Sequence, residues 1–156
     1  MVSNYLLPNK YKKVGWFLLI PSLVLGFLFT IGIEYNINTT VFAFWFDDIM
    51  EDLVLFSFIK ENIYNEIIGI CLLISLALVA FSKEKNEDEY ISRVRLDSLL
   101  WATYINYGLL FLAIIFIYGI PFQTIMIYNM FTILLIFIIR FNIVLFITKR
   151  QMENEK

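Results

Sequence analysis

Four long apolar stretches constrain this chain more than any other feature. They cover residues 14–33, 63–82, 98–118 and 122–148. Each is long enough to cross the hydrocarbon core of a bilayer, which takes about 20 helical residues. A chain that is 60% hydrophobic and carries 16 Phe can hide those side chains from water only in lipid. The sequence therefore predicts an all-α membrane protein, in which residues 1–156 form one membrane domain with four transmembrane helices.

The basic residues predict how these helices are oriented. Most of the 12 Lys and Arg residues precede the first stretch, separate the second from the third, or follow the fourth: Lys10, Lys12, Lys13, Lys83, Lys85, Arg93, Arg95, Lys149, Arg150 and Lys156. Lys60 lies in the first connection, and Arg140 lies inside the fourth stretch. Because cytoplasmic loops accumulate positive charge, we expect both termini and the central connection in the cytoplasm.

The composition removes several classes of chemistry. The chain has no His and a single Cys, Cys71, so the usual general base and the commonest metal ligand are both missing. Cys71 lies in the middle of an apolar stretch and is expected to be buried and inert. We expect no catalytic residues, no cofactor and no metal. A formal net charge of −2 gives no general attraction to nucleic acid.

The first connection has an unusual composition for a loop. Over residues 42–59, a helical projection places four carboxylates in one sector and apolar side chains in the opposite one; the four are Asp47, Asp48, Glu51 and Asp52. This pattern predicts an amphipathic helix on the outer side. It either lies on the membrane or caps the bundle, and capping is favoured because the polar face is acidic rather than basic. The acidic face either binds a cation or is simply solvated, and solvation is favoured because no Gly-containing ligand loop is present.

The central connection carries helix-start signals. Asn86 is a good N-cap, and Glu89 is placed to close a capping box, so the third helix is expected to run from near Glu87 to Tyr118. Its first turns would project into the cytoplasm as a stub, with an i,i+4 pair between Glu89 and Arg93. The stub consists of Glu87, Asp88, Glu89, Arg93 and Arg95. It is either a docking surface for a protein partner or a solubilised helix end, and the second is favoured.

Arg140 is the one charge that its position buries in an apolar stretch. Residues equidistant from the short turn near Ile120 lie at similar depth, which brings Arg140 within a helical turn of Asp97. An ion pair between Arg140 and Asp97 is predicted near the cytoplasmic edge. The alternative is a site for an ion or a lipid headgroup.

A second polar group is expected nearer the middle of the membrane. It consists of Ser22, Ser75, Asn106 and Asn129, with one residue in each apolar stretch. Such residues commonly form hydrogen bonds between helices. They would otherwise line a polar path, and the packing role is favoured.

The segment KEKNEDEYISRVRLDSLLWATYINY resembles a group of uncharacterised four-helix membrane proteins of Bacteroidota, which carry an EDE-x-I-x-x-x-R-x-x-S pattern before the third helix. Here the pattern falls on Glu87, Asp88, Glu89, Ile91, Arg95 and Ser98. The resemblance extends to LPNKYKKVGW and YNMFTILLIFIIRFN. It implies a location in the bacterial inner membrane and brings no activity with it.

These features together favour a non-enzymatic accessory or regulatory and sensory subunit, which acts through protein or lipid contacts. The alternative is a small oligomeric transporter or channel. Its polar path would be the layer of Ser22, Ser75, Asn106 and Asn129. Both a monomer and a homo-oligomer stay open, because helices in lipid do not associate through the hydrophobic effect.

Overall fold

The described part of the chain folds into four helices and one two-stranded sheet. The computed structural model describes residues 6–33, 35–46, 54–85 and 87–154. The elements are α1 (Asn9–Thr30), β1 (Asn38–Phe46), β2 (Val54–Asn62), α2 (Tyr64–Ala80), α3 (Glu89–Phe116) and α4 (Ile120–Asn154). The expectation of an all-α chain therefore holds for the four helices, and the sheet is the exception.

Three of the helices are long and apolar enough to cross a membrane, namely Asn9–Thr30, Glu89–Phe116 and Ile120–Gln151. This confirms the membrane character that the sequence predicts. The helix α2 is also apolar, but it has only 17 residues. At 1.5 Å per residue it is about 26 Å long, slightly less than the hydrocarbon core of about 30 Å.

Local sequence explains where α3 begins and where the chain turns from α3 into α4. The side chain of Asp88 accepts a hydrogen bond from Ile91 N at 2.8 Å and caps α3, so the helix begins two residues later than expected. Asn86, the predicted cap, lies outside the described residues. At the other end Gly119 takes a φ of +73°, which favours glycine. Pro121 follows in the first turn of α4, where a helix needs no N–H donor.

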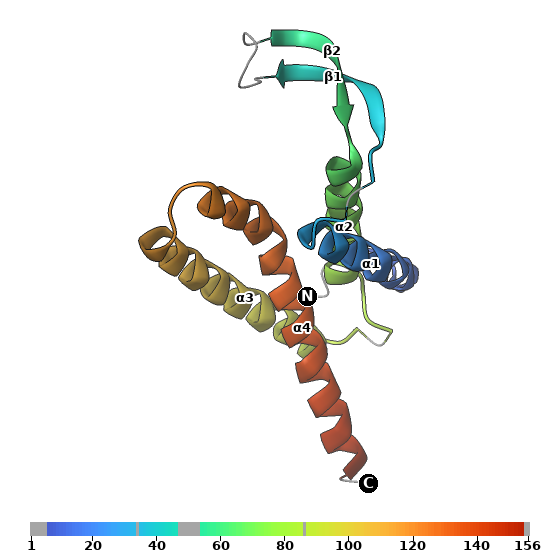
Figure 1. Ribbon diagram of the computed structural model, residues 1–156. Coiled ribbons are helices and arrows are strands. Elements are labelled where there is room, and N and C mark those ends of the chain that lie inside the picture. The colour runs from blue at the N-terminus through green and yellow to red at the C-terminus, as the bar shows by residue number, and fades with distance from the viewer. Residues whose placement is uncertain (1–5, 34, 47–53, 86, 155–156) are drawn as a thin grey trace.

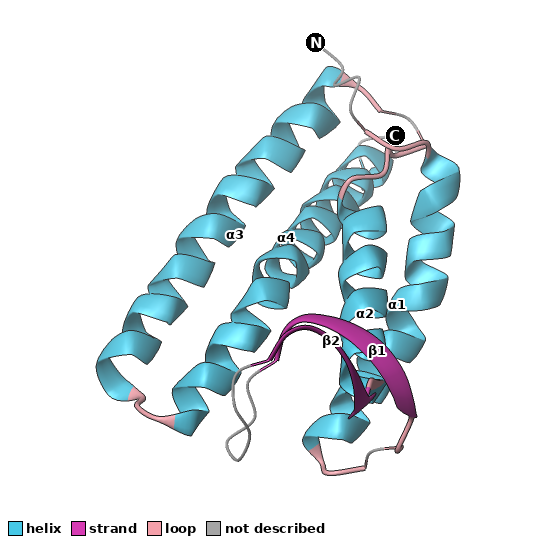
Figure 2. Cartoon of the chain, turned by 90° about the horizontal axis from the view of Figure 1, so that it is seen from above, coloured by secondary structure: helices cyan, strands magenta, loops and turns pink. Residues whose placement is uncertain are grey.

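The helices form two antiparallel hairpins, α1 with α2 and α3 with α4, and α2 packs against α4. In Figure 2 both chain termini lie at one end of the helices, which we call the termini end. The strands and the α3–α4 turn lie toward the other end, which we call the strand end. A core of buried apolar side chains joins the two hairpins, and it includes Leu19, Leu76, Ala102, Phe137 and Phe141.

A glycine allows α1 and α2 to approach closely. A Cβ atom built on Gly15 would lie 2.8 Å from Val79 Cγ2 and 3.0 Å from Val79 N. Atoms at that separation overlap, so any larger residue at position 15 would push α1 away from α2. Gly15 is therefore a packing residue at the termini end of this pair.

The amphipathic helix predicted over residues 42–59 is wrong for the described residues 42–46 and 54–59. The described parts of that segment belong to β1 and β2, which pair antiparallel with Phe42 opposite Phe58 and Asn38 opposite Asn62. The reason is local: Phe recurs at alternate positions among β-branched and aromatic residues, which is the period of a strand. The four acids, Asp47, Asp48, Glu51 and Asp52, lie outside the described residues. The strands extend away from the helices in Figure 1.

Candidate functional site

The termini end contains a buried ion pair. Arg95 Nη2 lies 3.1 Å from Glu87 Oε1 and 3.0 Å from Glu87 Oε2, while Arg95 Nη1 donates to the carbonyl of Ala80 at 3.0 Å. The guanidinium also lies over the ring of Phe141, 4.7 Å from its centroid. Charge-assisted hydrogen bonds are stronger than neutral ones, and here one guanidinium nitrogen serves the carboxylate while the other serves a main-chain carbonyl. These contacts tie the start of α3 to the end of α2 and to α4.

A second ion pair extends this cluster to α1. Lys12 pairs with Glu84, and its ammonium lies 5.9 Å from the centroid of the Phe141 ring. The backbone of Leu7 makes two hydrogen bonds to the segment after α2, at 2.9 Å to Phe81 O and 2.8 Å from Lys83 N. These ionic and main-chain contacts therefore connect the N-terminal segment, the α2–α3 connection and α4.

The proposed docking stub does not form one exposed surface. The side chains of Glu87 and Arg95 are only 7% and 12% exposed, because the α2–α3 connection folds back over α3. Asp88 is used as the helix cap. Glu89 and Arg93 are the exposed members, at 72% and 76%, and they pair with each other at 2.8 Å. In this chain the EDE-x-I-x-x-x-R-x-x-S pattern therefore covers the start of α3, where Glu87 and Arg95 are largely buried.

Arg140 reaches the residue that the sequence pairs with it, but through a different atom. Its Nη1 donates to the main-chain carbonyl of Asp97 at 2.6 Å. Its guanidinium lies over the ring of Trp101, 4.9 Å from the centroid. Among the described residues, no ion pair joins Arg140 to the Asp97 carboxylate. Arg140 therefore links α4 to α3 by a carbonyl and an aromatic ring in place of the expected carboxylate.

The predicted polar layer divides into two kinds of contact. The amides of Asn106 and Asn129 donate to each other reciprocally at 3.3 Å and join α3 to α4. Ser22 donates to Leu18 O at 2.8 Å, and Ser75 donates to Leu72 O at 2.9 Å, each within its own helix. The structure thus brings the two asparagines together, while the serines are satisfied locally.

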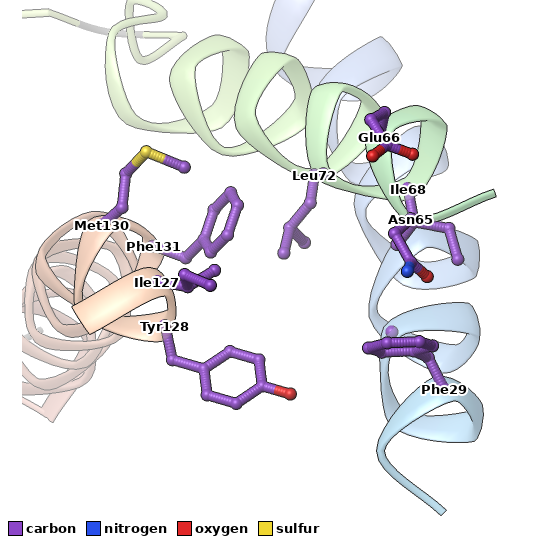
Figure 3. Close-up of a pocket in the computed structure, with 11 residues that line it drawn as sticks. Phe29, Asn65, Glu66, Ile68, Leu72, Ile127, Tyr128, Met130 and Phe131 are labelled. Carbon is purple, nitrogen blue, oxygen red and sulfur yellow. The ribbon is translucent and has the colours of Figure 1, made fainter. Parts of the chain in front are cut away.

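An apolar groove of about 320 Å³ opens between α1, α2 and α4 near the strand end. In Figure 3, Leu72, Ile127 and Phe131 face this space. Asn65 and Glu66, from the first turn of α2, are its polar members together with Tyr128. Sequence reasoning missed the groove. Its signal is the pair Gly26 and Gly69, which line the groove where larger side chains would fill it.

The sheet carries an exposed aromatic surface, which we call the Phe face: Phe42, Phe44, Phe56 and Phe58. The ring centroids of Phe42 and Phe58 are 5.3 Å apart and those of Phe44 and Phe56 are 5.0 Å apart, both edge-to-face. Each side chain is between 50 and 73% exposed. Phe56 has a φ of +56°, a conformation that is costly for a bulky residue. The sequence signal for this surface was the alternation of Phe on both strands.

The remaining reactive side chains offer little chemistry. Cys71 is exposed on α2, where the sequence predicts a buried residue. Within the described ranges, no group of three or more His, Cys, Asp or Glu residues could hold a metal ion.

Comparison of the chain with family models, with curated proteins and with solved structures gives no match.

Proposed function

We propose that this protein is a non-enzymatic accessory or regulatory subunit of a membrane assembly, which docks a protein partner through the β1–β2 sheet. The observation that carries the proposal is the Phe face, in which four exposed rings contact one another on a sheet of two strands. An apolar surface gathered in this way is typical of an interaction site.

The two-stranded sheet has too little support from the rest of the chain. An isolated hairpin is marginally stable in water, and a third strand or a covering layer is needed for independent stability. Neither β1 nor β2 pairs with a further strand among the described residues. When a partner covers a Phe ring, a large apolar area is removed from water. Binding of a partner would therefore stabilise the sheet, and the buried rings would contribute to the affinity of the complex.

The open edges of the sheet favour a protein over lipid as the occupant. An unpaired strand edge exposes N–H and C=O groups, and each costs several kcal/mol in hydrocarbon. A protein with a free strand would pair with that edge and cover the Phe face, as in β-strand addition. The sequence between β1 and β2 carries four acidic residues, so basic side chains are expected on the partner.

The distribution of Lys and Arg supports a placement of this sheet outside the cell, with both termini in the cytoplasm of a bacterium and the helices in its inner membrane. The partner would then be met on the outer side. Docking at the cytoplasmic stub has less support, because Glu87 and Arg95 are engaged with each other.

A small oligomeric transporter draws less support from the same geometry. Asn106 and Asn129 satisfy each other, and Ser22 and Ser75 satisfy carbonyls of their own helices. Polar groups that are already paired have little left to offer a solute.

The proposal is tested by photo-crosslinking in the native membrane. Phe58→p-benzoylphenylalanine places the crosslinker on the Phe face, and Phe146→p-benzoylphenylalanine places it on an exposed position of α4 as the control. We expect one discrete protein adduct from position 58 that position 146 does not give. The double variant Phe44→Ser and Phe56→Ser should abolish that adduct while leaving the helical circular dichroism unchanged.

Three results would overturn the proposal. Adducts with lipid alone at position 58 would make the Phe face a membrane contact. An adduct with twice the mass of this chain would make it a homo-oligomer contact. An adduct that survives the Phe44→Ser and Phe56→Ser double variant would show that the Phe face does not hold the partner.

A further inference from the structure

We propose that the groove between α1, α2 and α4 binds one lipid that has an ammonium headgroup, with an acyl chain in the groove and the headgroup beside Glu66. The groove is separate from the Phe face and shares no residue with it. This inference can therefore fail or succeed independently of the proposed docking function.

The size and lining of the groove fit an acyl chain. Its volume of about 320 Å³ is at the small end of ligand pockets, which run from about 300 to 1,000 Å³. Ile68 and Phe131 are both 8% exposed and belong to the groove walls, together with Leu72. A gap among such side chains loses van der Waals contacts unless an apolar group fills it.

The occupant comes from the bilayer because of where the groove opens. Two of its three walls belong to α1 and α4, which are long and apolar enough to cross a membrane. Ile127 and Met130, on the α4 wall, are 62% and 54% exposed, so the groove is open beside apolar side chains that face lipid. A lipid chain reaches this opening directly, whereas a water-soluble ligand would have to cross the apolar surface.

The polar residues at the groove select the headgroup. Asn65 and Glu66 lie in the first turn of α2, and Tyr128 extends across the space toward α1 in Figure 3. These three side chains form no hydrogen bond or ion pair with another described residue. The Glu66 carboxylate attracts an ammonium group, and the Asn65 amide can donate to the phosphate beside it. A zwitterionic aminophospholipid presents both groups together.

The experiment uses the full chain reconstituted in phosphatidylglycerol vesicles, whose headgroup has no ammonium, with a trace of photoactivatable lipid. One probe is a phosphatidylethanolamine with a diazirine on its acyl chain, and the other is a phosphatidylglycerol with the same acyl chains. The yield and position of labelling are read by mass spectrometry of peptides. We expect the ethanolamine probe to label peptides of α2 and α4 about twofold to fivefold more than the glycerol probe, as befits one partly exposed charge contact.

Variants at glycines test the site for the acyl chain, and a variant at Glu66 tests the site for the headgroup. A Cβ at Gly69 would lie 4.0 Å from Phe131 Cζ, so Gly69→Leu fills the groove without a clash at its Cβ. Gly26→Leu fills it from the α1 wall, and Gly108→Leu is the matched control because no atom lies within 4 Å of its added Cβ. Both fillers should lose the excess labelling by the ethanolamine probe, the control should keep that excess, and Glu66→Gln should make the two probes equal.

An excess of ethanolamine-probe labelling on α2 and α4 that persists in both Gly69→Leu and Gly26→Leu would overturn the proposal. Equal labelling by the two probes in the wild-type protein would overturn it as well, because the headgroup would then have no part in binding. The Phe44→Ser and Phe56→Ser double variant should label like the wild type, which keeps a failure here distinct from a failure of the docking proposal.

Discussion

Arg95 holds the carboxylate of Glu87 with one nitrogen, Nη2, at 3.1 and 3.0 Å from the two carboxylate oxygens, and it donates its other terminal nitrogen to Ala80 O. Both charges are largely removed from solvent. The pair therefore determines how the chain turns from α2 into α3, and its loss would leave a buried carboxylate without a counter-charge.

The first prediction separates this pair from the exposed one beside it. Arg95→Met should lower the stability of the protein in detergent by about 3 kcal/mol, since breaking a buried pair strands its partner. Arg93→Met is the matched control and should cost no more than about 0.5 kcal/mol, because its i,i+4 pair with Glu89 is exposed. Denaturant titration followed by circular dichroism measures both. Equal losses would contradict the buried role of Arg95.

The second prediction concerns the atom that Arg140 contacts. Because Arg140 donates to the main-chain carbonyl of Asp97, Asp97→Asn should change stability by less than about 0.5 kcal/mol. Trp101→Leu should cost about 1 kcal/mol by removing the ring beneath the guanidinium. The same titration distinguishes them. A larger loss in Asp97→Asn than in Trp101→Leu would show that the carboxylate carries the contact.

The third prediction uses the reciprocal amide pair. Asn106→Leu and Asn129→Leu each leave one amide without its partner, and each should cost about 0.6–1.7 kcal/mol, the range of hydrogen bonds between membrane helices. The double variant should cost less than the sum of the two single variants, since neither amide is then stranded. A double-mutant cycle measures this coupling, and strictly additive losses would show that the amides act separately.

The fourth prediction concerns the close approach of α1 and α2. Gly15→Ala should destabilise the protein by about 1–3 kcal/mol, the usual cost of overpacking, because the added Cβ would meet the side chain and the backbone of Val79. Gly108→Ala is the control and should be neutral or slightly stabilising, since alanine favours a helix. Equal behaviour of the two variants would contradict the contact at Gly15.

The helices could be predicted because their signals are local. An apolar run of membrane length identifies a helix without knowledge of its neighbours. The neighbourhood of Arg140 and Asp97 could also be predicted, since two helices that leave a short turn rise by the same 1.5 Å per residue. The atom that Arg140 contacts could not be predicted in this way, because a carbonyl and a carboxylate of one residue lie at the same depth.

The strands were not predicted because a helical pattern of acids and a strand-like alternation of Phe overlap in one segment. The four acids, Asp47, Asp48, Glu51 and Asp52, stand at positions i, i+1, i+4 and i+5, and this spacing places them in one sector of a helical projection. The alternation of Phe42 with Phe44 and of Phe56 with Phe58 was the stronger signal, because it has the period of a strand.

The site residues were harder still to predict. Glu87 and Arg95 looked like surface charges on a projecting stub. Their burial depends on the α2–α3 connection folding back onto α3, which no local pattern encodes. The groove likewise depends on how α2 and α4 approach each other, and only Gly26 and Gly69 hint at it in the sequence.

The most direct test of the docking proposal is the reactivity of a single thiol on the Phe face. In a Cys71→Ser background, Phe58→Cys is treated with a membrane-impermeant maleimide, first in the native membrane and then after purification and reconstitution in lipid, with Asn36→Cys as the exposed control. We predict that position 58 is protected in the native membrane and reactive after reconstitution, while position 36 reacts in both. Equal reactivity of position 58 in the two preparations would contradict the account.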